Sequence, residues 1–184
     1  MLVPTNREPP MPLSLHAAFV PSALQMIDST KKLVDRGEAW CNEQGSDASR
    51  VLSARIYEDM FPFTYQVKSV AVHTAGALAG VAKGAFQPDL SPPPASFDGL
   101  RAKLASARAA LEQTSEDDLE QAIGRDMRFE FRDFKLEFTA EEFLLSFSQP
   151  NFYFHAATAY DILRMLGVPV GKRDFNGRLR LRPG

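Results

Sequence analysis

The sequence predicts an all-α domain: a four-helix bundle with a small β-hairpin between the third and fourth main helices. Two observations predict this fold class. Four long stretches repeat apolar residues at a spacing of three and four, which is typical of amphipathic helices. A shorter stretch, MRFEFRDFKLEF, alternates apolar and polar residues, which is typical of two strands folded at Arg132 and Asp133. Packing the four apolar helix faces together is the simplest way to bury them.

The first helix is expected over residues 15–44. Ser14 precedes the apolar pattern as an N-cap, and Gly45 ends the pattern. Pro21 lies inside it, and proline lacks the N–H that an interior helical residue donates. The helix therefore either kinks at Pro21 or properly begins there, with residues 15–20 as a separate turn.

The second helix is expected from Pro62 to about Lys83, after a short helical piece at residues 47–54. Proline suits a first helical turn, because its missing N–H would be unpaired there anyway. His73 borders or joins the apolar stripe of this helix. Residues 84–95 carry a dense run of prolines and are expected to form a loop that connects two helices.

The third helix is expected over residues 97–114, with Ser96 as its cap. An acidic stretch, SEDDLE, follows and is expected to begin another helix. The strands of the hairpin come next, at residues 127–138. Since two strands alone are marginal in water, the apolar side of the hairpin must lie against the helices.

The fourth helix opens with residues 139–142, which have the form of a capping box. Pro150 should kink this helix or restart it at Gln149, because proline collides with the preceding turn. The helix is expected to run to Leu166. Gly167, followed closely by a proline, is a clear stop signal.

Length and composition favour a single domain with short flanking segments. A chain of 184 residues can bury a core of its own without a disulfide or a structural metal. Several prolines at the start predict a disordered leader at residues 1–12. Residues 13–177 are then the folded domain, and residues 178–184 are a basic C-terminal tail.

Charge and hydropathy exclude several functional classes. A formal net charge of −2 gives no electrostatic footprint for nucleic acid. No apolar run approaches the roughly 20 residues of a membrane span, so no membrane partner is expected. The single cysteine, Cys41, excludes an intramolecular disulfide and predicts a reducing compartment, with the cytoplasm as the expected location. Cys41 itself is expected to be half-buried and inert.

The candidate chemistry lies on histidines. Of the three in the chain, His16 stands at a helix start and is expected on the surface. His73 and His155 each project from a long amphipathic helix near its apolar stripe, and bundles bind metals and cofactors between facing helices. Spacing alone leaves two interpretations open: hydrogen-bonded core residues, or functional groups.

Asn151 stands one helical turn before His155 and shares its face. A metal site built from residues four apart needs histidine or carboxylate at both positions. An amide oxygen suits hard ions such as magnesium or calcium, whereas imidazole suits zinc, nickel, copper or iron. The pair therefore gives a mixed signal. The sequence also has no glycine-rich phosphate loop, no nucleophile elbow, no paired-cysteine motif and no HExxH motif.

Two motifs carry a family resemblance. The runs ARIYEDMFPFTYQV and NFYFHAATAYDILRMLGVPVGKRDFNG resemble an uncharacterised domain-of-unknown-function family within the DinB/YfiT-like superfamily of metalloenzymes. The resemblance covers residues 13–177. It implies a DinB-like four-helix bundle, often a homodimer, with a divalent metal, usually zinc or nickel. Relatives in that superfamily include thiol-dependent transferases and an isomerase.

The resemblance also implies a set of metal ligands. In the superfamily, one histidine on the second long helix and an HxxxH pair on the last helix hold the metal. His73 matches the first of these, and His155 matches the later histidine of the pair. Asn151 stands where the earlier histidine should be. This departure removes a strong ligand and puts the implied metal and the implied activity in question.

Two hypotheses of function follow. In the first, a pocket between the second and fourth helices holds a small organic molecule. His73 and His155 act there as acid and base or as residual metal ligands, and Asn151 orients the molecule. Three tyrosines could line such a pocket: Tyr65, Tyr153 and Tyr160. In the second hypothesis, the chain is a non-catalytic scaffold with a vestigial metal site, which binds a small ligand or forms a homodimer.

Overall fold

The computed structural model describes residues 13–182, so the predicted leader and the last two residues of the tail lie outside the described part. The chain begins with α1 (Leu15–Glu43), capped by the Ser14 hydroxyl, which accepts a hydrogen bond of 3.1 Å from the Ala17 N–H. Pro21 lies inside α1 without ending it. The helix therefore begins at Leu15 and not at the proline, and the predicted cap is confirmed.

The second long stretch contains a turn of π-helix that the sequence did not predict. After the short α2 (Ser49–Leu52), the chain forms α3 (Phe63–Ala71), the π-helical η1 (Val72–Gly76) and α4 (Ala77–Lys83) without interruption. Turns of π-helix occur frequently at functional sites, and this one carries His73.

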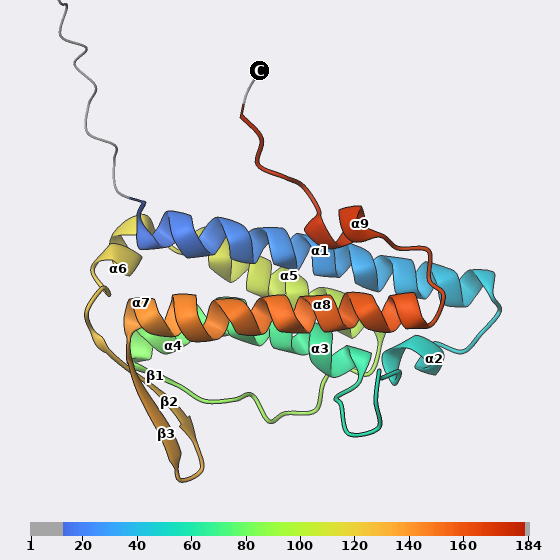
Figure 1. Ribbon diagram of the computed structural model, residues 1–184, viewed down its shortest axis with the longest axis horizontal. Coiled ribbons are helices and arrows are strands. Elements are labelled where there is room, and N and C mark those ends of the chain that lie inside the picture. The colour runs from blue at the N-terminus through green and yellow to red at the C-terminus, as the bar shows by residue number, and fades with distance from the viewer. Residues whose placement is uncertain (1–12, 183–184) are drawn as a thin grey trace, which may run out of the picture.

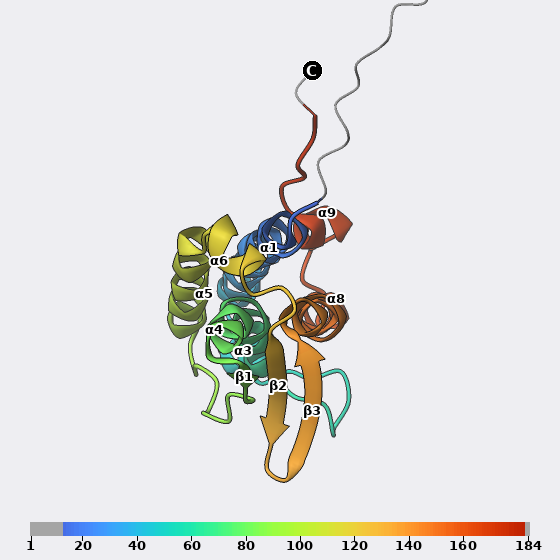
Figure 2. The same ribbon diagram turned by 90° about the vertical axis from the view of Figure 1, so that its left-hand side faces the viewer.

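A three-stranded sheet follows in the order β1-β2-β3. It consists of β1 (Ala85–Phe86), β2 (Asp126–Phe131) and β3 (Phe134–Thr139). β2 pairs antiparallel with β3, and β1 pairs parallel with β2. Residues 84–95 were expected to be loop throughout, and β1 corrects this, because a two-residue strand is too short to show alternation. The paired β2 and β3 project away from the helices (Figures 1 and 2).

The remaining helices are α5 (Phe97–Gln113), α6 (Glu116–Glu120), α7 (Ala140–Glu142), α8 (Gln149–Met165) and α9 (Lys172–Asn176). A second π-helical segment, η2 (Phe143–Ser148), joins α7 to α8. The fourth stretch changes from π to α geometry at Gln149, one residue before Pro150. The wider π turn thus precedes the proline that was expected to kink or restart the helix.

The long helices pack side by side, as the end-on view shows (Figure 2). α1 contacts α5 and α8, and α3 contacts α5 and α8. Within residues 13–182 the chain is mostly helical with one small sheet, and none of its helices is both long and apolar enough to cross a membrane. η1 also lies against α8, which brings the segment of His73 beside that of His155.

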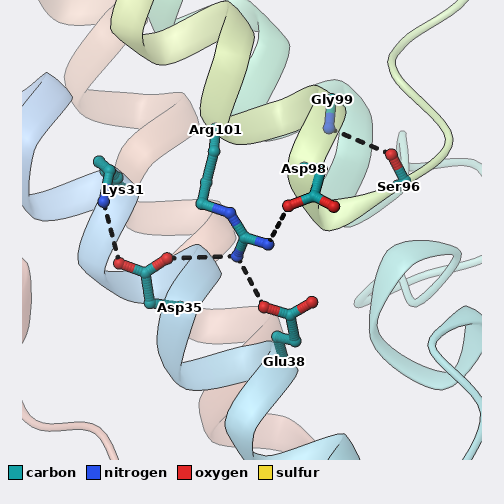
Figure 3. A network of polar contacts seen from close by, with 7 residues as sticks. All are labelled: Lys31, Asp35, Glu38, Ser96, Asp98, Gly99 and Arg101. Carbon is teal, nitrogen blue, oxygen red and sulfur yellow. Dashed lines mark hydrogen bonds and ion pairs between the residues drawn. The ribbon is translucent and has the colours of Figure 1, made fainter.

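An arginine reinforces the contact between α1 and α5. The Arg101 guanidinium of α5 forms ion pairs with Glu38 at 2.7 Å and Asp35 at 3.3 Å on α1, and with Asp98 on its own helix (Figure 3). The three carboxylates are substantially exposed, so each pair contributes modestly to stability.

Candidate functional site

His155 is held by an amide that the sequence analysis missed. Its Nδ1 lies 2.7 Å from the Gln66 Oε1, and the Gln66 Nε2 donates a hydrogen bond of 2.8 Å to the Phe61 carbonyl. Only the amide nitrogen can donate to a carbonyl, so the oxygen of Gln66 must face the histidine. His155 Nδ1 therefore carries the proton and donates, which leaves its Nε2 unprotonated in the neutral ring.

Gln66 is fully enclosed by the fold, with 2% of its surface exposed. It stands three residues after Phe63 and four before Val70, and both of these belong to the buried stripe of the second helix. A polar residue on an apolar stripe was the signal that could have identified it. Buried polar groups need partners, and the partner here is the candidate histidine itself.

His73 stacks on His155. The two ring centroids are 5.7 Å apart, and the ring planes differ by 18°. The Nδ1 of His73 is buried and has no hydrogen-bond partner among residues 13–182. A buried N–H without an acceptor is rarer in proteins than an acceptor without a donor. The proton of the neutral ring is thus best placed on Nε2.

The outward-facing nitrogens of the two rings are complementary. Neither Nε2 has a hydrogen-bond partner in the described part of the chain, and neither is among its buried unpaired atoms. With the tautomers above, His73 presents an N–H donor and His155 presents a lone pair. The arrangement offers one donor and one acceptor to a molecule that approaches from solvent.

Burial keeps both imidazoles uncharged at neutral pH. Burial, with a smaller contribution from the nearby His155, lowers the pKa of His73 to about 3. Burial also lowers the pKa of His155 to about 4. At pH 7 the pair is therefore a neutral donor and acceptor.

Aromatic rings surround the histidines. His155 lies 5.4 Å from Phe154 and 6.1 Å from Tyr65, measured between ring centroids. Phe61 stacks on Tyr65 at 3.9 Å. On the other side, His73 lies 5.5 Å from Phe86. His73 also contacts Phe147, which belongs to a cluster of phenylalanines from the sheet and η2.

The structure brings only some of the predicted residues to this pair. Asn151 donates through Nδ2 to the Phe147 carbonyl at 2.7 Å, one turn earlier on its own helix. Of the three tyrosines, only Tyr65 contacts a candidate histidine; Tyr153 packs on the neighbouring Phe152, and Tyr160 packs on Phe175.

The remaining reactive residues lie elsewhere. The ring of His16 lies beside the Thr114 carbonyl, with Nε2 at 3.2 Å. Cys41 is buried, with 2% of its surface exposed, and not half-buried as expected. It sits in the core at the end of α1, which is consistent with an inert thiol.

A cavity of about 600 Å³ lies between α4, β1 and α5. Small residues such as Ala75, Ala79 and Ala107 line it, and neither candidate histidine does. Phe86 lines the cavity and also contacts His73, so its ring lies between the cavity and the histidine pair. The pocket predicted between the second and fourth helices remains a prediction.

Comparison with known proteins gives the family. Residues 15–176 match the family described as "Domain of unknown function (DUF1993)". The chain belongs to this family. This DUF1993 chain is also similar to a crystal structure of a DinB family member protein from Shewanella denitrificans, with 28% sequence identity and a TM-score of 0.76. The likeness covers 92% of this chain and 96% of that one. The curated proteins contain no match.

The DinB resemblance implies zinc or nickel, and the residues of this DUF1993 chain do not fit such a metal. Residues 13–182 contain no cluster of three or more His, Cys, Asp or Glu side chains able to hold an ion. Coordination through both Nε2 atoms would force the proton of His73 onto Nδ1, where it has no acceptor. Asn151 can offer only its amide oxygen, which suits hard ions better than zinc or nickel. Its amide nitrogen donates a hydrogen bond to the Phe147 carbonyl.

Proposed function

We propose that this DUF1993 protein is a DinB-like four-helix bundle that binds a small organic molecule at His73 and His155 and acts on it by acid–base chemistry. The observation that supports this most is the Gln66 amide. Held by the Phe61 carbonyl, it fixes His155 in the tautomer whose lone pair faces outward. Orientation of an imidazole by a third group is the usual arrangement behind an acid–base histidine.

In this proposal each ring has one role. His155 Nε2 accepts a proton or a hydrogen bond from the bound molecule, and His73 donates its Nε2–H to an oxygen or nitrogen of that molecule. A neutral imidazole can polarise a carbonyl without carrying charge. Asn151, tied to its own helix, positions the backbone near Phe147 and does not touch the molecule.

A second candidate is binding without turnover, on a scaffold with a vestigial metal site. The low pKa values of His73 and His155 favour it, because an imidazole with a pKa of about 4 is a weak base at neutral pH. The misfit to zinc or nickel also favours it. Both candidates place the ligand at the same histidine pair.

A ligand-observed NMR screen tests the site and separates the two candidates. A library of small neutral, acidic and basic compounds is screened against wild type, His73→Ala and His155→Ala, with His16→Ala as the matched control. The proposal predicts hits that are lost in the first two variants and kept in the control. Compounds that bind His73→Ala and His155→Ala as well as they bind wild type would overturn the proposal. Hits that stay chemically unchanged over days of incubation would favour binding without turnover.

A further inference from the structure

The surroundings of the histidine pair restrict the chemistry of its ligand. The aromatic neighbours of the two rings within residues 13–182 are Tyr65, Phe86, Phe147 and Phe154, and the one hydrogen bond to a side chain is to the neutral amide of Gln66. The nearest buried cation along α3 is Lys68, whose ammonium is engaged by Asp89 and Ser91. Within residues 13–182 no charged side chain forms a hydrogen bond or an ion pair with either histidine ring.

Exposed aromatic rings lie near His155. Phe154 and Phe61 are each 58% exposed, so both rings can contact a bound molecule. Phe154 touches His155 directly, and Phe61 reaches it through the stacked Tyr65. Flat rings pack well on such surfaces in offset or edge-to-face geometry.

From these observations we propose that the site takes a neutral aromatic molecule bearing a hydrogen-bond donor beside an acceptor, as an aryl carboxamide does. This rests on the function proposed above. The amide N–H donates to His155 Nε2, the carbonyl accepts from His73 Nε2, and the ring lies against Phe154 and Tyr65. One head group thereby satisfies both outward nitrogens at once.

Charged analogues lose part of this match. A carboxylate has no proton for His155 and places its charge against a lone pair. An amidinium has no acceptor for His73 and places its charge against an N–H. In each case an ion leaves water without a partner of opposite charge, which is costly. The preference for a neutral ligand over charged analogues therefore follows from the tautomers of His73 and His155.

Four probes of similar size test the inference. Benzamide, benzoate, benzamidine and cyclohexanecarboxamide are titrated into ¹⁵N-labelled protein at pH 7.5, and the dissociation constants come from chemical-shift changes. Benzamide should bind about tenfold more tightly than either charged probe, the effect of one unmade hydrogen bond. Cyclohexanecarboxamide should bind more weakly than benzamide, because it lacks the aromatic face.

Variants locate the binding. His73→Ala and His155→Ala should abolish benzamide binding, and Phe154→Ala should weaken it several-fold. Phe134→Ala is the matched control, since Phe134 is similarly exposed, at 56%, on the distant hairpin. Circular dichroism of each variant verifies that the fold is intact.

The outcomes separate this inference from the proposed function. Tighter binding of benzoate or benzamidine through the same histidines would overturn the neutral class, and equal binding of cyclohexanecarboxamide would overturn the aromatic class. Histidine-dependent hits of other chemistry, with no benzamide binding, would also overturn the inference and leave the function standing. If no compound binds through the histidines, both fail.

Discussion

Two buried polar residues on the same helix differ in how completely they are bonded. Gln66 and Lys68 stand two positions apart on α3, and each has 2% of its surface exposed. The Lys68 ammonium donates to the carbonyls of Asp89 and Ser91 and to the Ser91 hydroxyl, and it pairs with the Asp89 carboxylate at 3.1 Å. Every proton of the ammonium has an acceptor.

The network around Gln66 is incomplete. The amide is bonded at both ends, to Phe61 and His155. Beyond it, both Nε2 atoms and the Nδ1 of His73 have no partner in the described chain. Fully bonded buried networks hold structure together, whereas a buried group without a partner, such as the Nδ1 of His73, is rare and calls for another explanation. The comparison favours a structural role for Lys68, and it supports the ligand-binding role proposed for the histidine pair.

The largest effect is expected for Lys68→Met. This change removes the buried cation and releases the proline-rich segment after β1, and it should lower the free energy of unfolding by about 3 kcal/mol, as for other broken buried pairs. Urea denaturation measures it. Lys103→Met is the control, because Lys103 reaches the same Asp89 from a more exposed position at 3.5 Å and should cost under about 1 kcal/mol. Equal losses in the two variants would refute the structural role.

The ion pair between Lys68 and Asp89 should also make stability depend on pH in the acid range. Burial of the Asp89 carboxyl alone would raise its pKa, but hydrogen bonds from Ser91 and Lys68 outweigh burial, and the pKa lies below the usual 3.8. A lowered folded-state pKa gives stability that is present above pH 3.8 and is lost as the pH falls further. The free energy of unfolding of wild type should therefore fall below about pH 4, and that of Lys68→Met should fall less over the same range. Urea denaturation at a series of pH values measures both.

A smaller loss is expected for Gln66→Leu. This change leaves the Phe61 carbonyl and the Nδ1 of His155 without partners, at a cost of about 2 kcal/mol. Adding His155→Phe removes one of the two unpaired groups, so the double variant should cost less than the two single effects combined. Strict additivity in urea denaturation would show that the Gln66–His155 bond does not couple the two residues.

The histidine pair should also make stability depend on pH. The pKa values of His73 and His155 in the folded protein, about 3 and about 4, lie below the unfolded value of 6.5. The unfolded chain therefore binds more protons between these values, and stability falls as the pH drops from about 6.5 to 4. Because each histidine contributes up to about 1.4 kcal/mol per pH unit, wild type should lose about 2 kcal/mol per pH unit more than a His73→Phe, His155→Phe variant. Parallel pH profiles from thermal denaturation would contradict the low pKa values.

The smallest difference is expected in metal content between wild type and a variant without the two histidines. Protein purified without chelator or nickel resin should contain far less than one metal per chain by inductively coupled plasma mass spectrometry. A His73→Ala, His155→Ala variant should contain the same amount. Near-stoichiometric metal that disappears in the variant would show that the pair is a metal site despite Asn151.

The sequence predicted the helices best where local side-chain chemistry determines their ends. The capping roles of Ser14, Ser96 and Thr139 are confirmed, because each hydroxyl accepts from the N–H three residues later. β1 and the two π turns were not predictable, because pairing with a distant strand and a wider helical turn leave no periodic signal in so few residues.

The site was only partly predictable. The proximity of His73 and His155 was expected from their helices and from the family resemblance, and their rings do stack. Gln66 was missed, because a single polar residue on an apolar stripe does not reveal which partner it meets. The homodimer, the cytoplasmic location and the absence of a nucleic-acid partner stay predictions.

The tautomers of the three histidines test the central claim most directly. In a long-range ¹H–¹⁵N NMR correlation of the imidazole rings at pH 7, the account predicts His155 protonated on Nδ1 and His73 protonated on Nε2, with both rings neutral. His16, outside the pair, is the internal reference. A proton on the Nε2 of His155, or an imidazolium at either position, would contradict the account.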